Sequence, residues 1–212
     1  MTPADDLTES WRHAYGEAGY ARVRRTAVGI AGAGGLGSNC AVCLVRSGFR
    51  RLRIFDHDRV EAANLNRQYY AADQIGRPKV EALAANLRAI HPDLAIHAVH
   101  TQLTSDNTAA AFSECDVVVE ALDAPADKAM LLECLAPGGR LIVAASGLAG
   151  NGDPAGFHVH ELGPSIRIVG DGISAQDPAH PVLAPRVMIA AAWQAHVVLT
   201  ETLAGRVGKG DA

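Results

Sequence analysis

Residues 26–38 of this 212-residue chain read TAVGIAGAGGLGS. A short apolar run leads into a cluster of glycines, and an apolar helical pattern follows, which predicts a buried strand, a tight turn and a helix. The spacing of Gly32, Gly34 and Gly37 matches the turn in which glycines let the backbone approach a phosphate at a helix N-terminus. The stretch therefore predicts a nucleotide site at the end of a strand.

Outside this stretch, strand and helix patterns alternate along the chain. Further strands are predicted at 52–55, 95–99, 117–121 and 140–145. Helices are predicted at 8–25, 36–47, 79–90, 106–112 and 128–135, with Thr8 as the cap of the first. This alternation is typical of an α/β, Rossmann-like fold with a doubly wound, mostly parallel sheet.

The whole chain, 1–212, is interpreted as one domain with three parts. An N-terminal helix occupies 1–25, and the nucleotide-binding core occupies 26–148. An irregular C-terminal extension, 149–212, holds short strands at 157–162 and 166–169, a proline-bearing crossover loop and a helix at 186–203.

Composition excludes several classes of protein. The chain has 19 Lys and Arg against 23 Asp and Glu, a net charge of −4, and 49% hydrophobic residues. It is therefore expected to fold, and nucleic acid is not expected as its main partner. The apolar stretch 188–199 is too short for a bilayer, and the N-terminus lacks the pattern of a signal peptide. Four cysteines are too few for a disulfide scaffold, so a reduced, cytoplasmic protein is expected.

Charged residues near the predicted strand ends indicate which nucleotide is bound. Asp56 ends the second strand and can hydrogen-bond ribose hydroxyls, which alone would favour an NAD-dependent oxidoreductase. Arg67 and Lys79 favour a more highly charged ligand, because a helix N-terminus already satisfies a pyrophosphate. Asp123 follows the fourth strand and would repel phosphates unless a divalent cation lay between them. Together these residues favour ATP with Mg²⁺.

These residues resemble the ThiF/MoeB family, bacterial relatives of ubiquitin-activating enzymes. The similarity is carried by Gly32–Ser38, DHDRVEAANLNRQ at 56–68, GRPKV at 76–80 and Asp123, and it extends through Ala184-Pro185. The short form, with AASG at 144–147 and GDG at 170–172, is most similar to the thiamine-pathway ThiF proteins.

The resemblance implies ATP- and Mg²⁺-dependent adenylation of the C-terminal glycine of a ThiS-like sulfur carrier ending in Gly-Gly. It further implies a homodimer and a sulfurtransferase as a possible second partner. Arg67 and Lys79 would act on the phosphates and Asp123 would bind Mg²⁺, while the loop from Gly170 to Pro185 would lie near the carrier tail. The other expected ATP contacts are Gly32, Gly34, Gly35, Leu36, Gly37, Asp56, Asp58, Asn64, Gln68 and, from a neighbouring subunit, Arg12.

The chain departs from the family pattern at several positions. Ala124 follows Asp123 where relatives often have Asn, and Lys128 is the nearest cation where they have Arg. Because no cysteine follows Cys134, neither a zinc site nor a thioester in the crossover loop is expected. The Cys-x-x-Cys of Cys40 and Cys43 supplies only two of the four ligands of a structural zinc site, so core packing is expected.

Three alternatives to the thiamine role stay open. Within the same class, the carrier could be another one, such as the small subunit of molybdopterin synthase. From other classes come an NAD-dependent oxidoreductase and a non-catalytic scaffold that binds a nucleotide or a ubiquitin-like partner.

Overall fold

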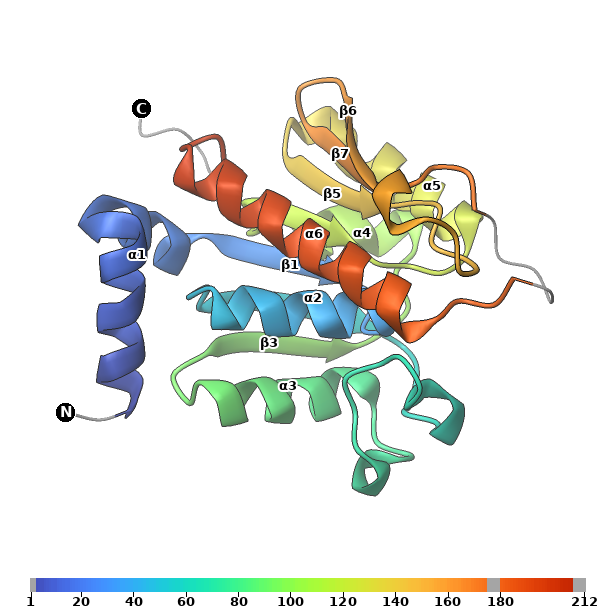
Figure 1. The fold of residues 1–212 in the computed structure, drawn as a ribbon, viewed down its shortest axis with the longest axis horizontal. Coiled ribbons are helices and arrows are strands. Elements are labelled where there is room, and N and C mark those ends of the chain that lie inside the picture. The colour runs from blue at the N-terminus through green and yellow to red at the C-terminus, as the bar shows by residue number, and fades with distance from the viewer. Residues whose placement is uncertain (1–2, 175–179, 208–212) are drawn as a thin grey trace.

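A computed structural model of the chain describes residues 3–174 and 180–207. Seven strands form one sheet in the order β3-β2-β1-β4-β5-β7-β6, in which only β6 runs antiparallel to its neighbour (Figure 1). The strands are β1 (Ala27–Ala31), β2 (Arg51–Asp56), β3 (Ala95–His100), β4 (Val117–Glu120), β5 (Leu141–Ala145), β6 (His158–Leu162) and β7 (Ile166–Gly170). The predicted doubly wound, mostly parallel sheet is confirmed.

Helices cover both faces of the sheet. In Figure 1, α2 (Gly35–Arg46), α3 (Lys79–Ile90) and α6 (Ala184–Leu203) lie in front of the strands. Behind them lie α4 (Ser105–Ala111) and α5 (Pro125–Leu135). The described residues also form four short 3₁₀ turns: η1 (Ala62–Asn64), η2 (Ala72–Gln74), η3 (Ala136–Gly138) and η4 (Pro154–Gly156). In the described part of the chain, no helix has the combination of length and apolar character needed to cross a bilayer.

Strand β1 is the centre of the core, since all five of its residues are buried. Its Val28 pairs with Leu52 of β2 and with Val117 of β4. A side chain at Gly29 would place its Cβ 2.5 Å from the ring of Phe112, which explains the glycine in an otherwise apolar strand. Cys40 packs in the main core and Cys43 against it.

Helix α1 (Pro3–Arg25) begins earlier than predicted, so the assignment of Thr8 as its cap is wrong. Proline is well tolerated in the first turn of a helix, where its missing N–H needs no partner. The helix kinks at Gly16, whose φ of 68° is readily adopted by glycine. Trp11 Nε1 donates to Arg46 O over 3.0 Å and Arg22 Nη1 to Leu203 O over 3.2 Å, which attaches α1 to the ends of α2 and α6.

The other predicted elements are found with small shifts at their ends. Helix α5 begins at Pro125 rather than residue 128, again with proline in the first turn. The two short strands expected after residue 156 form the β6–β7 hairpin at the edge of the sheet.

Candidate nucleotide site

The carboxyl ends of β1, β2 and β4 surround a cavity of about 140 Å³. Ligands of open α/β sheets bind at this edge, where the chain order of the strands reverses. The cavity is lined by Gly32, Gly34, Phe55, Asp56, His57, Asp58, Lys79, Thr101, Leu103, Ala121, Leu122, Asp123, Ala124 and Asp127. It therefore brings together six of the residues selected from the sequence, from the glycine loop, the end of β2, the start of α3 and the β4–α5 loop.

The three glycines of the loop are needed for different reasons. Gly32 has a φ of 96°, and a Cβ there would lie 2.5 Å from Ala121 O. A Cβ on Gly37 would overlap the carbonyl oxygen of Gly32. Gly34 is different, because its Cβ would meet only Gln68 Nε2, at 3.9 Å. The protein's own packing therefore requires the outer two glycines, whereas Gly34 leaves open space beside the cavity.

The N-terminus of α2 is suited to an anion. Gly34 is its N-cap, and among residues 3–174 and 180–207 no side chain caps the helix, so its first N–H groups are available to a phosphate. Gly35 and Leu36 are its first two residues. The side chain of Leu36 packs in the core, which leaves its backbone N–H as the group that could contact a ligand.

Asp56 joins the glycine loop to β2. Its Oδ2 accepts a hydrogen bond from Ala33 N at 2.6 Å, and its Oδ1 accepts one from Asp58 N at 2.7 Å. Tyr70 supports the same loop, because its Oη donates to Ala33 O over 2.6 Å. Asp56 thus has a structural role that the sequence analysis missed, in addition to the predicted contact with ribose.

Lys79 is held by an ion pair at the wall of the cavity. Its Nζ lies 2.7 Å from Asp58 Oδ2, and its side chain is only 6% exposed. Burial opposes ionisation of Asp58, but the hydrogen bond and charge of Lys79 outweigh it, so the pKa of this carboxyl lies below its ordinary value. Asp58, predicted as a nucleotide contact, is therefore the counter-ion of Lys79.

The segment after η1 lies beside the start of α2. Asn39 Nδ2 donates to both Gly35 O and Arg67 O, at 2.7 and 3.0 Å. Arg67 does not line the cavity; its Nη1 donates to Asn66 Oδ1 over 2.8 Å. Gln68 is buried and faces Gly34. Both residues are thus placed next to the first turn of α2, where phosphates are expected.

Two predicted contacts have other partners in the structure. Asn64 Oδ1 accepts a hydrogen bond from Glu61 N at 3.0 Å and so caps η1. Arg12 lies on α1, at the end of the sheet away from the glycine loop (Figure 1), and pairs with Glu9 at 2.7 Å and Glu17 at 3.2 Å. Arg12 thus contributes nothing to the nucleotide site of its own chain.

The charges around the cavity fit a divalent cation. Its lining contains four aspartates against one lysine and one histidine. Carboxylate oxygens are the ligands that Mg²⁺ prefers. Asp123 and Asp127 lie on the β4–α5 side, whereas Asp56, His57 and Asp58 form a group whose ligand atoms lie within 4.8 Å of one another. Asp127 was missed by the sequence analysis.

The crossover loop is anchored where it leaves β7 and where it enters α6. Arg186 Nη2 pairs with Asp171 Oδ2 at 2.7 Å, and Arg186 Nη1 donates to Gly152 O over 2.8 Å. Burial opposes ionisation of Asp171, but hydrogen bonds from Ser174, Ile173 and Arg186 lower its pKa to about 2. The whole loop, 170–185, was predicted to lie near the carrier tail, and its middle, 175–179, lies outside the described residues.

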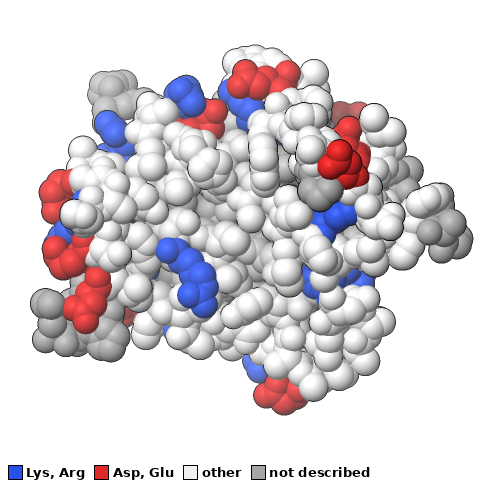
Figure 2. Space-filling model, in the orientation of Figure 1, with Lys and Arg blue, Asp and Glu red and all other residues white. Residues whose placement is uncertain are grey.

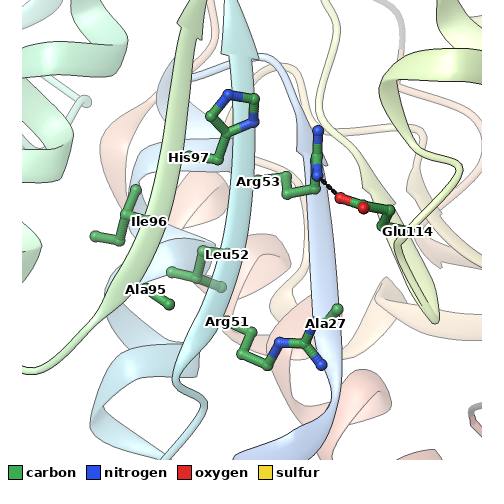
Figure 3. Close-up of a pocket in the computed structure, with 8 residues that line it drawn as sticks. All are labelled: Ala27, Arg51, Leu52, Arg53, Ala95, Ile96, His97 and Glu114. Atoms are coloured by element: carbon green, nitrogen blue, oxygen red, sulfur yellow. Dashed lines mark hydrogen bonds and ion pairs between the residues drawn. The ribbon is translucent and has the colours of Figure 1, made fainter.

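A second cavity, of about 270 Å³, opens at the amino ends of β1, β2 and β3 (Figure 3). Arg51, Arg53 and His97 line it, and Arg53 pairs with Glu114. None of the residues selected from the sequence lies there. The smaller cavity is therefore the candidate site.

The profile of the ThiF family matches residues 8–205. The chain belongs to the ThiF family. Ubiquitin-like modifier-activating enzyme 5 of Drosophila grimshawi is 40% identical over 117 residues, which cover 55% of this ThiF-family chain and 29% of that protein. The Aedes aegypti enzyme of the same name is 47% identical over 77 residues, 36% of this chain and 19% of that protein. The aligned part thus spans less than a third of these relatives.

Solved structures share the fold of this ThiF-family chain. E. coli tRNA N6-threonylcarbamoyladenosine dehydratase, TcdA, in complex with AMP, matches with a TM-score of 0.84 at 21% identity, over 93% of this chain and 94% of that one. E. coli MccB with ATP matches with a TM-score of 0.69 at 20% identity, over 94% of this chain and 63% of that one. At such identities the likeness shows the fold alone.

Proposed function

We propose that this ThiF-family protein uses ATP to adenylate the C-terminal glycine carboxylate of a small ubiquitin-like protein and releases pyrophosphate. The observation that supports this best is the cavity in which Gly34, Lys79 and Asp123 meet beside the uncapped start of α2. The relatives named as ubiquitin-like modifier-activating enzymes support the class of partner. The complex of TcdA with AMP supports an adenine nucleotide in this fold.

The chemistry requires positioning more than proton transfer. A carboxylate oxygen of the partner attacks the α-phosphorus, the bond to the oxygen that bridges the α- and β-phosphorus breaks, and pyrophosphate leaves. The nucleophile is already ionised at neutral pH, so no general base is needed. Lys79 would stabilise the phosphate charge, and Arg67 would approach from the segment beside the first turn of α2. The ion pair with Asp58 fixes the Lys79 ammonium group at the cavity wall in advance.

Mg²⁺ is the proposed cofactor. Four aspartates line the cavity and would repel a triphosphate. Asp123, with Asp127 beside it, would hold the ion, and the ion would neutralise charge between the carboxylates and the phosphates. The same acidic lining disfavours NAD, whose pyrophosphate carries less charge and needs no such metal.

The proposed partner is a ThiS-like sulfur carrier of thiamine thiazole synthesis, with a sulfurtransferase as a further partner. It rests on the resemblance of AASG at 144–147 and GDG at 170–172 to thiamine-pathway proteins. A ubiquitin-like modifier or another sulfur carrier is the second candidate, because the relatives named above are activating enzymes for such modifiers.

A homodimer is the proposed assembly. Helix α6 exposes Met188 and Trp193 with fractions of 49% and 39%, and Leu183 precedes it with 40% exposed. Figure 2 shows that charged side chains are sparse across the middle of the face that α6 crosses. A second copy that covers this apolar surface would remove it from water. In such a dimer, Arg12 is the proposed contribution of one chain to the site of the other.

ATP–pyrophosphate exchange tests the proposal. We expect Mg²⁺-dependent exchange that requires a carrier ending in Gly-Gly. Separate assays with a ThiS-like carrier, a molybdopterin-type carrier and a ubiquitin-like modifier identify the partner. ATP binding without exchange for any of these would favour the scaffold alternative. Binding of NAD but not ATP would favour the NAD-dependent oxidoreductase. Turnover that depends on tRNA would contradict a protein partner.

A further inference from the structure

A buried ion pair lies directly behind the β4–α5 loop. Glu120 ends β4, and its side chain is only 1% exposed. Lys128 of α5 places its Nζ 2.9 Å from both carboxylate oxygens of Glu120. Lys128, the nearest cation to Asp123 in the sequence, therefore has a partner inside the fold. Its ammonium group is engaged behind the loop, and the residue does not line the cavity.

The pair is bonded to the loop that presents Asp123. Glu120 Oε1 accepts a hydrogen bond of 2.7 Å from Leu122 N, the backbone group next to Asp123. Lys128 Nζ also donates to Ala145 O, at the end of β5, over 3.3 Å. On the opposite side, Gly32 is packed against the backbone of Ala121 and Leu122. The turn before Asp123 is thus fixed from both sides.

An ionised carboxylate would not remain in this buried position without its partner. Burial raises the pKa of Glu120, and the charge and hydrogen bond of Lys128 oppose that effect. Removing the lysine alone would leave an unpaired buried charge, which proteins tolerate poorly. Lys128 therefore keeps the Glu120 carboxylate in place as the acceptor for Leu122.

We propose that Glu120 and Lys128 are positioning residues that hold Asp123 in the orientation required to bind a divalent cation beside the nucleotide. This inference rests on the proposed function for its metal–nucleotide ligand. It assigns a role to Lys128, the first cation after Asp123 in the sequence. The pair acts through the backbone of Leu122 and does not touch the ligand.

The test measures metal binding directly. Mn²⁺ replaces Mg²⁺ as a paramagnetic probe, and its binding to the protein with a non-hydrolysable ATP analogue is followed by electron paramagnetic resonance. The main variant is the double substitution Glu120→Leu/Lys128→Met, which removes the pair without leaving a lone buried charge. The matched control, Glu120→Gln/Lys128→Met, keeps an acceptor for Leu122, and Asp123→Asn shows the effect of losing the ligand itself.

We expect Mn²⁺ binding at least about tenfold weaker in the Leu/Met variant, the scale seen when a group that orients a metal ligand is lost. The Gln/Met variant should bind more tightly than the Leu/Met variant but more weakly than the wild type, because its neutral amide is a poorer acceptor for Leu122 and the bond from Lys128 to Ala145 is lost. Lys128→Arg, which keeps the cation, should resemble the wild type. Binding of the analogue without metal and the unfolding midpoint report whether the fold survives. If the Leu/Met variant does not fold, the comparison of Gln/Met with Lys128→Arg decides, and equal Mn²⁺ affinity of these two overturns the inference.

The outcomes separate this inference from the proposed function. Wild-type Mn²⁺ affinity in a folded Leu/Met variant would refute the positioning role while leaving adenylation intact. Weaker Mn²⁺ binding in that variant, with no pyrophosphate exchange by the wild type for any carrier, would support the positioning role and refute the function. A wild-type protein that binds no Mn²⁺ with the analogue would contradict both.

Discussion

Alanine substitutions at Gly37 and Gly34 separate what the fold requires from what the nucleotide requires. A Cβ on Gly37 would overlap the backbone oxygen of Gly32, which cannot rotate away, so the glycine loop must shift. A Cβ on Gly34 would meet only Gln68 Nε2, at 3.9 Å. We therefore expect Gly37→Ala to destabilise the free protein and Gly34→Ala to spare it.

The magnitudes follow from these contacts. Overpacking costs about 1–3 kcal/mol, and the contact with backbone places Gly37→Ala near the upper end. The gain of about 1 kcal/mol from alanine in a helix leaves a net loss of about 2 kcal/mol. For a chain of this length the unfolding midpoint should fall by about 4–8 °C. Alanine is a poorer N-cap than glycine, so Gly34→Ala should lower the free energy of unfolding by about 0.5 kcal/mol. Its unfolding midpoint should therefore fall by about 2 °C or less.

Thermal unfolding without ligand, followed by calorimetric titration with ATP, provides both readouts. Gly34→Ala should weaken ATP binding at least about tenfold, because its methyl group fills the space expected for a phosphate at the start of α2. A Gly37→Ala midpoint within about 1 °C of the wild type would refute the packing argument. Wild-type ATP affinity in Gly34→Ala would show that the phosphates do not pass over this glycine.

Four further predictions concern other positions. Asp123→Ala should abolish carrier-dependent pyrophosphate exchange without lowering the unfolding midpoint, and unimpaired exchange would defeat its assignment as metal ligand. Lys79→Ala should slow the same exchange on the order of 100-fold, whereas wild-type rates would exclude it from the phosphate site. Cys40→Ala/Cys43→Ala should keep its activity and its zinc content, since both side chains pack with the core; loss of zinc in elemental analysis would refute core packing. The pKa of Asp171 is lowered to about 2 from an ordinary 3.8. The contribution of its carboxylate to the free energy of unfolding should therefore be complete above about pH 4 and should be lost as the pH falls towards 2. Acid unfolding of Asp171→Asn should therefore be less steep, and a curve identical to that of the wild type would contradict this.

The features of the fold and the site that could be predicted are those that depend on short patterns of neighbouring residues. The apolar run before Gly32 indicates the end of a strand, and the proline before Lys79 indicates the start of a helix. Both signals come from residues next to each other in the sequence. The carboxyl ends of parallel strands meet at one edge, so the convergence of Asp56, Lys79 and Asp123 also followed from the sequence. Their pairings could not be predicted, because they depend on side-chain directions. The ion pair of Asp58 with Lys79, for example, is not indicated by any pattern in the sequence.

One missed feature did leave a signal. Glu120 closes the buried run Val117–Glu120, and a carboxylate at such a position needs a cation nearby. Lys128, eight residues further along the chain, was the available candidate. The cap formed by Asn64 left no such signal. Its residue type suits a phosphate contact and a turn cap equally well, and only the structure of η1 shows the cap.

The pairing of β1 with both β2 and β4 also determines when the nucleotide site can form as the chain folds. β1 and β2 are near neighbours in sequence, but β4 follows only after α3, β3 and α4. Non-local parallel pairings of this kind form slowly, because the chain loses the entropy of closing a long loop before the stabilising contacts between the strands can form. Asp56 and Asp123 lie on opposite sides of β1, so the cavity is complete only when β4 has docked. A pulse of ATP analogue during refolding should therefore be bound late, and the lag would report the docking of β4 rather than the collapse of the chain.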